Sequence, residues 1–331
     1  MLIASDNFIS FKIGHVNISF SVDNDDLRIA IQQWLKDFQI SIPEKPQKMI
    51  KVRLHHFEPN QPLPYNIPNQ AKLTDQNNDA KYYTYRNLWI VEFAQAGIMI
   101  INRSTLNVLG LVYSEILLES VWDFDIFMHP LYELMRQLGL YTQHSGAVSY
   151  DGFGLLLAGK SGQGKSTLSV DLLEKGFSFL SDDRCFLLDD SGSTEVIGIY
   201  EPAKVFAFNI KHISKLNSIE GLSSDIHTKN HLDLRIYYPE KIQLKTPLNG
   251  IIFPSWSPSE KSRLETLSPG KALIELLPLT MVCFDTATSK THFEFLGEVV
   301  SKTPLSRLIL GYDRENWHSL VLEFISHSWR Q

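Results

Sequence analysis

The 331-residue sequence contains only two cysteines, Cys185 and Cys283, and no Cys/His pattern at metal-ligand spacing. A disulfide framework is therefore excluded, and both thiols are expected to be buried in a reducing compartment. No apolar run reaches the length of about 18 residues that a transmembrane helix needs. Residues 1–7 lack the basic and apolar regions of a signal peptide. We therefore expect a cytoplasmic protein that does not associate with membranes.

An excess of positive charge is also missing. The chain has 31 Lys and Arg against 37 Asp and Glu, which gives a net charge of −6. This argues against a nucleic-acid partner or an anionic-membrane surface, although a local basic site is compatible with it. Hydrophobic residues make up 44% of the chain, enough for a real core, and the length predicts two domains or one large domain with an appendage.

The most informative stretch runs from Gly159 to Ser166 and reads G-K-S-G-Q-G-K-S, the phosphate-binding P-loop pattern. A short apolar strand, 155–158, precedes it and a helix-compatible run, 166–175, follows it. Glycines at three loop positions allow the backbone N–H groups to point at an anion, and the helix N-terminus adds partial positive charge. The alternative is a glycine-rich turn without a ligand, but this does not explain the Lys-Ser pair.

Two acidic residues follow the P-loop at a short distance. The strand 177–181 ends directly before Asp182 and Asp183, and only sixteen residues separate Lys165 from Asp182. In phosphoryl transfer one such carboxylate can hold Mg²⁺ while another accepts the proton of an attacking hydroxyl. A solvated Asp-Asp turn is the alternative, and the distance from the P-loop favours the functional interpretation.

The strand that enters the P-loop is expected to be antiparallel to its predecessor. Asp151-Gly152 stands between two runs that favour β-strands, 144–150 and 153–158, which is a strong hairpin signal. P-loop proteins of the Ras type begin with a parallel strand instead, so the sequence predicts a different nucleotide-binding fold.

Outside this stretch, hydrophobic periodicity predicts an α+β accessory region over 1–130. Residues 131–331 are then expected to form the domain that contains the P-loop and the two aspartates, and with them the catalytic function. The expected elements of the accessory region are a hairpin 9–13 and 16–22, a helix 27–38, a strand 50–54, a mobile surface loop 58–80, strands 82–93 and 97–101, and a helix 112–127. A further helix begins with Pro130 in its first turn and ends at Gly139. Near the C-terminus we expect helices 269–277 and 317–325, and 305–310 as strand or helix.

The segment from His144 to Asp183 resembles the catalytic domain of HPr kinase/phosphorylase and the HPr-kinase-like serine kinases, a fold shared with phosphoenolpyruvate carboxykinase. The resemblance is carried by His144-Ser-Gly-Ala, the P-loop to Thr167, Gly176 and Leu180-Ser-Asp-Asp183. Looser similarity to an HPr-kinase-related subgroup extends over 200–204, 229–235, 251–254, 267–271 and 303–308. The resemblance as a whole implies an α/β P-loop domain with a mixed sheet, preceded by a smaller α+β region.

By position, the resemblance implies ATP and Mg²⁺ as cofactors. Lys165 would contact the phosphates, Asp182 would be the general base, and Asp183 and Ser166 would hold Mg²⁺, with the roles of the two aspartates open to exchange. His144 would lie near the transferred phosphate, and Lys229 and Arg235 are candidate phosphate clamps. The expected nucleotide-binding residues are Gly159, Lys160, Ser161, Gly162, Gln163, Gly164, Lys165, Ser166, Thr167, Lys229 and Arg235.

Two features differ from the HPr kinases. Thr167 stands where they commonly carry Glu, and the glycine- and arginine-rich segment of the bifunctional enzymes is missing after Asp183. We therefore do not infer from the resemblance that this chain catalyses phosphorolysis or that HPr is its acceptor. The sequence predicts an ATP-dependent kinase for a hydroxyl, serine on a peptide or protein being preferred. A small-molecule kinase, for example for free serine, and a nucleotide-binding regulatory module without transfer remain open, and a homo-oligomer is the family expectation.

Overall fold

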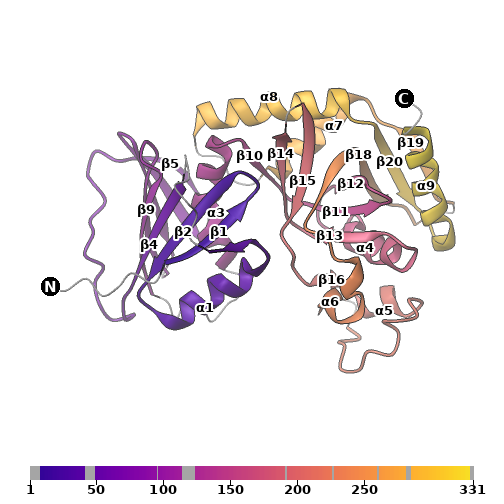
Figure 1. Ribbon diagram of the computed structural model, residues 1–331, viewed down its shortest axis with the longest axis horizontal. Helices are drawn as coiled ribbons and strands as arrows, with labels where there is room; N and C mark the ends of the chain where they lie inside the picture. Colours follow the sequence, from indigo (N-terminus) through magenta and orange to yellow (C-terminus); the bar gives the residue numbers. More distant parts are fainter. Residues whose placement is uncertain are drawn as a thin grey trace. The chain divides into compact units, whose positions relative to one another are not determined.

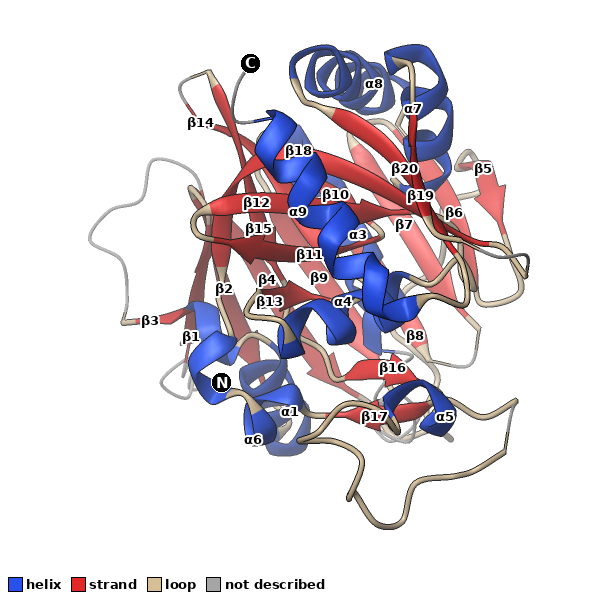
Figure 2. Cartoon of the chain, turned by 90° about the vertical axis from the view of Figure 1, so that its right-hand side faces the viewer, coloured by secondary structure: helices blue, strands red, loops and turns tan. Residues whose placement is uncertain are grey.

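A computed structural model describes residues 8–41, 49–94, 96–113, 124–190, 192–225, 227–258, 261–280 and 285–328. The chain forms two compact units (Figures 1 and 2). The first comprises Met1–Leu140 and Val282–Ser289, and the second comprises Tyr141–Met281 and Lys290–Gln331. Each unit is built around its own sheet.

The first unit contains a nine-stranded sheet in the order β3-β1-β2-β4-β9-β8-β7-β6-β5. Alternating apolar residues bury one face of the β1–β2 hairpin, as predicted, and Asn24 caps the following helix through a hydrogen bond from Leu27 N at 2.8 Å. The elements are β1 (Phe8–Ile13), β2 (Val16–Val22), α1 (Asp25–Trp34), η1 (Lys36–Phe38), β3 (Gln39–Ile40), β4 (Met49–His56), β5 (Lys72–Gln76), β6 (Ala80–Tyr85), β7 (Leu88–Phe93), β8 (Gly97–Asn102), β9 (Asn107–Val112) and α3 (Phe124–Gln137).

Three predictions for the first unit were wrong in part. The loop expected over 58–80 contains β5, an exposed edge strand that gains its backbone hydrogen bonds from β6. Pro130 lies inside α3, not in a first turn, because the helix already begins at Phe124; the proline is buried there and cannot donate a backbone hydrogen bond. Val112 ends β9, so no helix begins there, and residues 114–123 of that expected helix lie outside the described residues.

The second unit contains a mixed sheet in the order β10-β14-β15-β18-β12-β11-β13, with β20 beside β18 and β19 beside β20. Its strands are β10 (Leu140–Gln143), β11 (Ser145–Tyr150), β12 (Phe153–Ala158), β13 (Ser178–Ser181), β14 (Cys185–Asp190), β15 (Ser193–Gly198), β18 (Lys245–Trp256), β19 (Arg263–Thr266) and β20 (Leu305–Leu310), with β16 (Ala203–Val205) and β17 (Asn230–Leu232) forming a separate pair. The helices are α4 (Lys165–Glu174), α5 (Ala207–Ile210), α6 (Leu234–Tyr237), η2 (Pro239–Lys241), α7 (Pro269–Leu276), η3 (Leu277–Leu279), α8 (Thr286–Lys302), η4 (Arg314–Asn316) and α9 (Trp317–Ser328), and the boundary between the units falls within α8.

Strand β12 contributes side chains to both hydrophobic clusters, one on each face of this sheet. Its residues Leu155 and Leu157 pack with α4 and α9, whereas Leu156 and Ala158 pack with α7 and α8 on the opposite face. The predicted hairpin is confirmed, because β12 is antiparallel to β11. It is parallel to β18, and β18 is parallel to β20, so the carboxyl ends of three strands meet at one edge.

The close approach of β12 to β18 depends on Gly154. A Cβ atom at this position would lie 1.9 Å from Pro247 O and 2.4 Å from Thr246 Cγ2. We expect Gly154→Ala to lower the free energy of unfolding by about 3 kcal/mol, because backbone atoms must move to accept the methyl group. Urea denaturation measures the change. Gly270→Ala is the control, because no heavy atom apart from its chain neighbours and its own helix backbone would lie within 4 Å of the added Cβ, and it should be neutral or slightly stabilising. An equal loss of unfolding free energy in both variants would contradict the explanation.

The mixed α/β class predicted from the sequence is confirmed. Segment 305–310 is a strand, and the helices expected near the C-terminus are present as α7 and α9. Cys185 is buried with a free thiol, as expected, while Cys283 lies outside the described residues. Among the described helices, none combines the length and apolar character needed to cross a bilayer.

Candidate active site

The P-loop connects the end of β12 to the start of α4 (Figure 1). Gly162 and Gly164 have φ angles of 86° and 99°, in the left-handed region that glycine adopts without strain. Gly164 is also the N-cap of α4, and a Cβ atom there would lie 2.7 Å from Leu310 Cδ1. The requirement for glycine in this loop is therefore confirmed, and it turns the N-terminus of a ten-residue helix toward the cavity.

Lys165 begins α4 and lies largely buried beneath the loop. Its Nζ donates to Gly159 O at 2.6 Å and to Lys160 O at 3.4 Å. Burial lowers the pKa of its ammonium group, while the negative charges of Asp183 and Asp182 act in the opposite direction. These two carbonyl oxygens hold the ammonium group in place. Because they compete only weakly with a phosphate for it, a bound phosphate can replace them.

Asp182 follows β13 and its side chain is almost wholly enclosed, with 2% of the residue exposed. Oδ2 accepts a hydrogen bond from Lys204 N at 3.0 Å, whereas Oδ1 is buried without a hydrogen-bond partner among the described residues. Burial raises the pKa of this carboxyl to about 6, against the opposing hydrogen bonds from Lys204 and the side chain of Ser166. The carboxylate thus lies beside the P-loop serine with one oxygen still to be satisfied.

Asp183 has a different environment from its neighbour. Its carboxylate bonds to His144 Nε2 at 2.8 Å and to Lys204 Nζ at 3.1 Å, and 23% of its side chain is exposed. Burial alone would raise its pKa, but the hydrogen bond and charge of His144, together with Lys204, hold the pKa well below its usual range. Asp183 is therefore an ionised carboxylate that a molecule in the cavity can reach.

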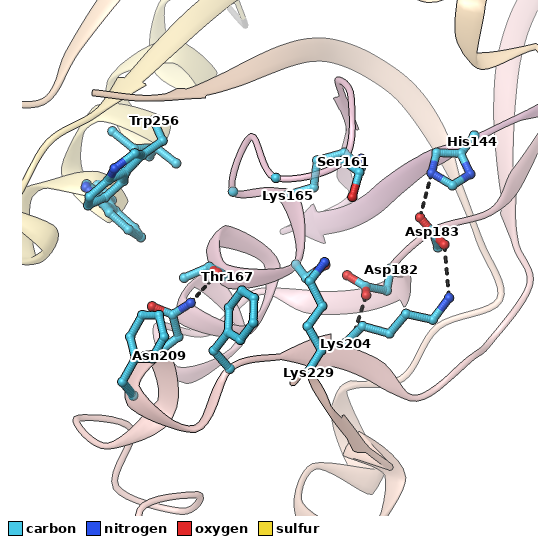
Figure 3. A pocket seen from close by; sticks show the side chains of 17 residues that line it. His144, Ser161, Lys165, Thr167, Asp182, Asp183, Lys204, Asn209, Lys229 and Trp256 are labelled. Atoms are coloured by element: carbon cyan, nitrogen blue, oxygen red, sulfur yellow. Dashed lines mark hydrogen bonds and ion pairs between the residues drawn. The ribbon is translucent and has the colours of Figure 1, made fainter. Parts of the chain in front are cut away.

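These groups line one cavity of about 600 Å³ in the second unit (Figure 3). The lining residues are His144, Ser161, Gly162, Gly164, Lys165, Ser166, Thr167, Asp182, Asp183, Lys204, Phe206, Phe208, Asn209, Lys229, Trp256, Leu310 and Trp317. A cavity of this size holds a nucleotide-sized ligand.

Most of the site residues predicted from the sequence therefore lie together, but four do not line the cavity. Gly159 contributes its carbonyl oxygen to Lys165, and Gln163 Oε1 accepts from Lys160 N at 2.9 Å, which braces the loop. The guanidinium of Arg235 lies over the ring of Tyr200 at 3.7 Å. Arg235 is therefore not placed to contact a ligand in the cavity, whereas Lys229 lines it.

Seven of the lining residues were not selected as site residues from the sequence. These are Lys204, Phe206, Phe208, Asn209, Trp256, Leu310 and Trp317. Lys204 could have been selected from the sequence, because segment 200–204 resembles a strand of the relatives that carries a basic residue. The others come from elements far from the P-loop in sequence, and ordinary core or surface roles account equally well for an isolated aromatic residue.

The polar groups beside the P-loop fit a magnesium ion. Magnesium binds to proteins through one or two carboxylates together with substrate phosphates and water, and does not require a complete protein cage. The carboxylate of Asp182 lies beside Ser166, and its Oδ1 has no hydrogen-bond partner among the described residues. The hydroxyl of a P-loop Ser or Thr is the other protein ligand that magnesium usually has in such sites. Among the described residues, no three His, Cys, Asp or Glu side chains gather as a metal site, so the oxygens of a nucleotide would complete the coordination.

No family model matches the chain. Several curated proteins with similar sequences carry the name HPr kinase/phosphorylase. The one from Mycoplasma mycoides subsp. mycoides is 25% identical over 198 residues, which covers 56% of this chain and 58% of the relative. The one from Malacoplasma penetrans is 30% identical over 122 residues, which covers 31% of this chain and 40% of the relative. The one from Pelodictyon phaeoclathratiforme is 48% identical over 48 residues, 14% of each protein.

Among solved structures, the HPr(Ser) kinase/phosphatase from Coxiella burnetii aligns with 56% of this chain and 94% of its own, at 14% identity and a TM-score of 0.30. A score this low carries no argument about the fold, which rests on the strands and helices described above. The sheet and the P-loop define a mixed α/β P-loop protein. Its curated relatives support an HPr-kinase-like family, as the sequence predicted, and the chain matches only 58% and 40% of the length of the first two.

Proposed function

We propose that this protein is an ATP-dependent kinase that transfers the γ-phosphate to a hydroxyl group, with serine in a peptide or protein as the acceptor. The observation that carries the proposal is the convergence of Lys165, Ser166 and the two carboxylates of Asp182 and Asp183 on one cavity. A P-loop alone would suit simple nucleotide binding. An accessible ionised carboxylate beside it is what a transfer to a hydroxyl needs.

The phosphates of ATP would lie on the N–H groups of the loop and the N-terminus of α4. Lys165 would exchange its bonds to loop carbonyls for bonds to the phosphates. Lys229 lines the same cavity and adds a second positive charge. Because the transferred group carries its charge on its outer oxygens, cations fixed around it stabilise the transition state without rearrangement.

We assign the metal-binding role to Ser166 and Asp182. Asp182 is the buried carboxylate beside the P-loop serine, and its Oδ1 is the oxygen left to be satisfied. Magnesium at this place would neutralise charge on the β- and γ-phosphates. This exchanges the two aspartate roles relative to the first expectation from the sequence, an exchange that the sequence left open.

Asp183 then takes the role of proton acceptor, because it is the more accessible member of the pair. The acceptor oxygen forms a bond to the γ-phosphorus, the bond from that phosphorus to the β,γ-bridging oxygen breaks, and the hydroxyl proton passes to the Asp183 carboxylate. ADP and the phosphorylated acceptor are the products. The lowered pKa keeps Asp183 ionised and able to accept the proton, and in a loose transition state the hydroxyl gives up that proton only as its bond to phosphorus forms, when the oxygen has become acidic.

His144 and Lys204 position the carboxylate of Asp183 from two sides. Their bonds of 2.8 Å and 3.1 Å fix its plane and keep it ionised. Lys204 also contacts Glu201 at 3.9 Å, so its ammonium group is shared between two carboxylates. We infer that it turns toward the phosphate as negative charge develops there, which frees one oxygen of Asp183 for the hydroxyl.

The acceptor is the least constrained part of the proposal. The relatives carry a name that specifies a protein, HPr, which supports a protein or peptide acceptor. The test is ATP consumption by the purified chain in the presence of serine-containing peptides, candidate proteins or free serine, with Ser→Ala peptides as matched controls. We expect consumption to require the serine hydroxyl. Stimulation by free serine alone would establish a small-molecule kinase, and ATP binding without ADP formation under any condition would establish a regulatory module; both contradict the proposal.

A further inference from the structure

Two large aromatic side chains are exposed where they meet the same cavity. Trp256 is 46% exposed and Phe208 is 48% exposed, and both line the cavity that contains the P-loop. Single exposed apolar residues are common and need no explanation. Two that come from different elements and converge on one ligand-sized cavity indicate a surface that a flat apolar group can cover.

The position of Trp256 follows from the topology of the sheet. It is the last residue of β18, and β18 runs parallel to β12, whose carboxyl end continues into the P-loop. In such sheets ligands bind outside the carboxyl ends of the parallel strands. Tyr312 and Trp317 contact the Trp256 ring edge to face, at 5.5 Å and 6.4 Å between centroids, so the indole is held in place.

Phe208 is held in place from a second direction. Its ring stacks on that of Phe206 at 5.4 Å between centroids and an interplanar angle of 8°. The neighbouring Asn209 donates from Nδ2 to Thr167 Oγ1 at 3.1 Å, which ties α5 to the first turn of α4. The aromatic pair is therefore attached to the helix end that receives the phosphates.

The two ends of the cavity differ in chemistry. His144, Asp183 and Lys204 form one end, and Figure 3 shows Trp256 and Asn209 on the opposite side of Lys165 from His144. A nucleotide whose terminal phosphate lies at the charged end must direct its nucleoside away from that end. Trp256 lies on that far side, and so does Asn209, the neighbour of Phe208 in the sequence (Figure 3).

We propose that Trp256 and Phe208 form the nucleobase site, with the indole of Trp256 as the main stacking surface. This inference rests on the proposed function, because it assumes that the P-loop binds a nucleotide. Stacking of a base on an aromatic side chain needs no particular pattern of hydrogen-bond donors, since every base has a π-face. The site therefore contributes affinity for the base in addition to the phosphate contacts.

The test compares two ligands by isothermal titration calorimetry on the full chain in the presence of Mg²⁺: ATP, and inorganic tripolyphosphate, which has no base. We expect Trp256→Ala to weaken ATP binding about tenfold, as expected for the loss of one stacking contact. Tripolyphosphate binding should be unchanged. Phe208→Ala should act in the same direction, and Trp256→Phe, which keeps a π-face, should restore most of the ATP affinity.

Phe293→Ala is the matched control, because Phe293 is 47% exposed in α8 and does not line the cavity. It should leave both affinities unchanged. Unaltered ATP affinity in Trp256→Ala and Phe208→Ala, with both variants folded, would overturn the nucleobase site while leaving the kinase proposal intact. Equal weakening of ATP and tripolyphosphate would also overturn it. Failure of the wild-type chain to bind either ligand would instead contradict the proposed function itself.

Discussion

Asp183→Asn is expected to lower kcat for phosphoryl transfer by about a thousandfold, within the range that general-base catalysis contributes, while Mg²⁺-ATP binding changes little. The amide keeps the size of the side chain and can still accept a hydrogen bond, but it cannot take the proton of the acceptor hydroxyl. Asp183 is the more accessible carboxylate of the pair and contacts His144 and Lys204. Steady-state kinetics and nucleotide titration of the same preparation provide the two measurements.

The companion variant Asp182→Asn separates the two carboxylates. Because Asp182 is buried beside Ser166, its replacement should raise the Mg²⁺ concentration required for half-maximal activity, and saturating Mg²⁺ should recover part of the turnover. Asp183→Asn should show no such recovery. The opposite pattern, with Mg²⁺ rescue of Asp183→Asn only, would restore the original assignment of Asp182 as base and Asp183 as metal ligand.

Lys165→Ala is expected to reduce both nucleotide affinity and turnover. The loss of a charged hydrogen bond to a phosphate should weaken ATP binding by about ten- to a hundredfold. Turnover should fall further, by about a thousandfold, because the same ammonium group stabilises charge that develops in the transition state. Calorimetry and initial rates measure the two effects.

Lys175→Ala provides the control for Lys165→Ala. Lys175 is the C-cap of the same helix α4 and is exposed, so its removal changes the net charge equally without touching the cavity. It should retain wild-type binding and turnover. An Lys165→Ala variant that is folded and binds ATP as tightly as the wild type would show that the loop does not hold the phosphates.

The features predictable from the sequence are those encoded by short local patterns. The Asp151-Gly152 turn predicted the antiparallel β11–β12 hairpin, and the glycines of the P-loop predicted its left-handed backbone. The short interval between Lys165 and Asp182 placed both in one cavity because a strand, a turn and a helix of ordinary length return the chain to the same sheet edge. Each of these follows from a few neighbouring residues.

The features that were not predictable depend on contacts between distant segments. Trp256 reaches the cavity only because β18 lies parallel to β12, a pairing that no local pattern specifies. The environments of Asp182 and Asp183 differ because one faces Ser166 and the other His144, although the two residues are adjacent. The edge strand β5 was missed because its polar residues resemble a loop until β6 provides its hydrogen bonds.

The most direct measurement follows the γ-phosphate itself in a single turnover, with enzyme in excess over γ-labelled ATP and a serine-containing peptide or protein present. We expect the label to appear on the serine oxygen as ADP forms, and both the Ser→Ala acceptor and the Asp183→Asn enzyme to prevent this transfer. Release of all label as inorganic phosphate, at the same rate with and without any hydroxyl acceptor, would contradict the kinase assignment.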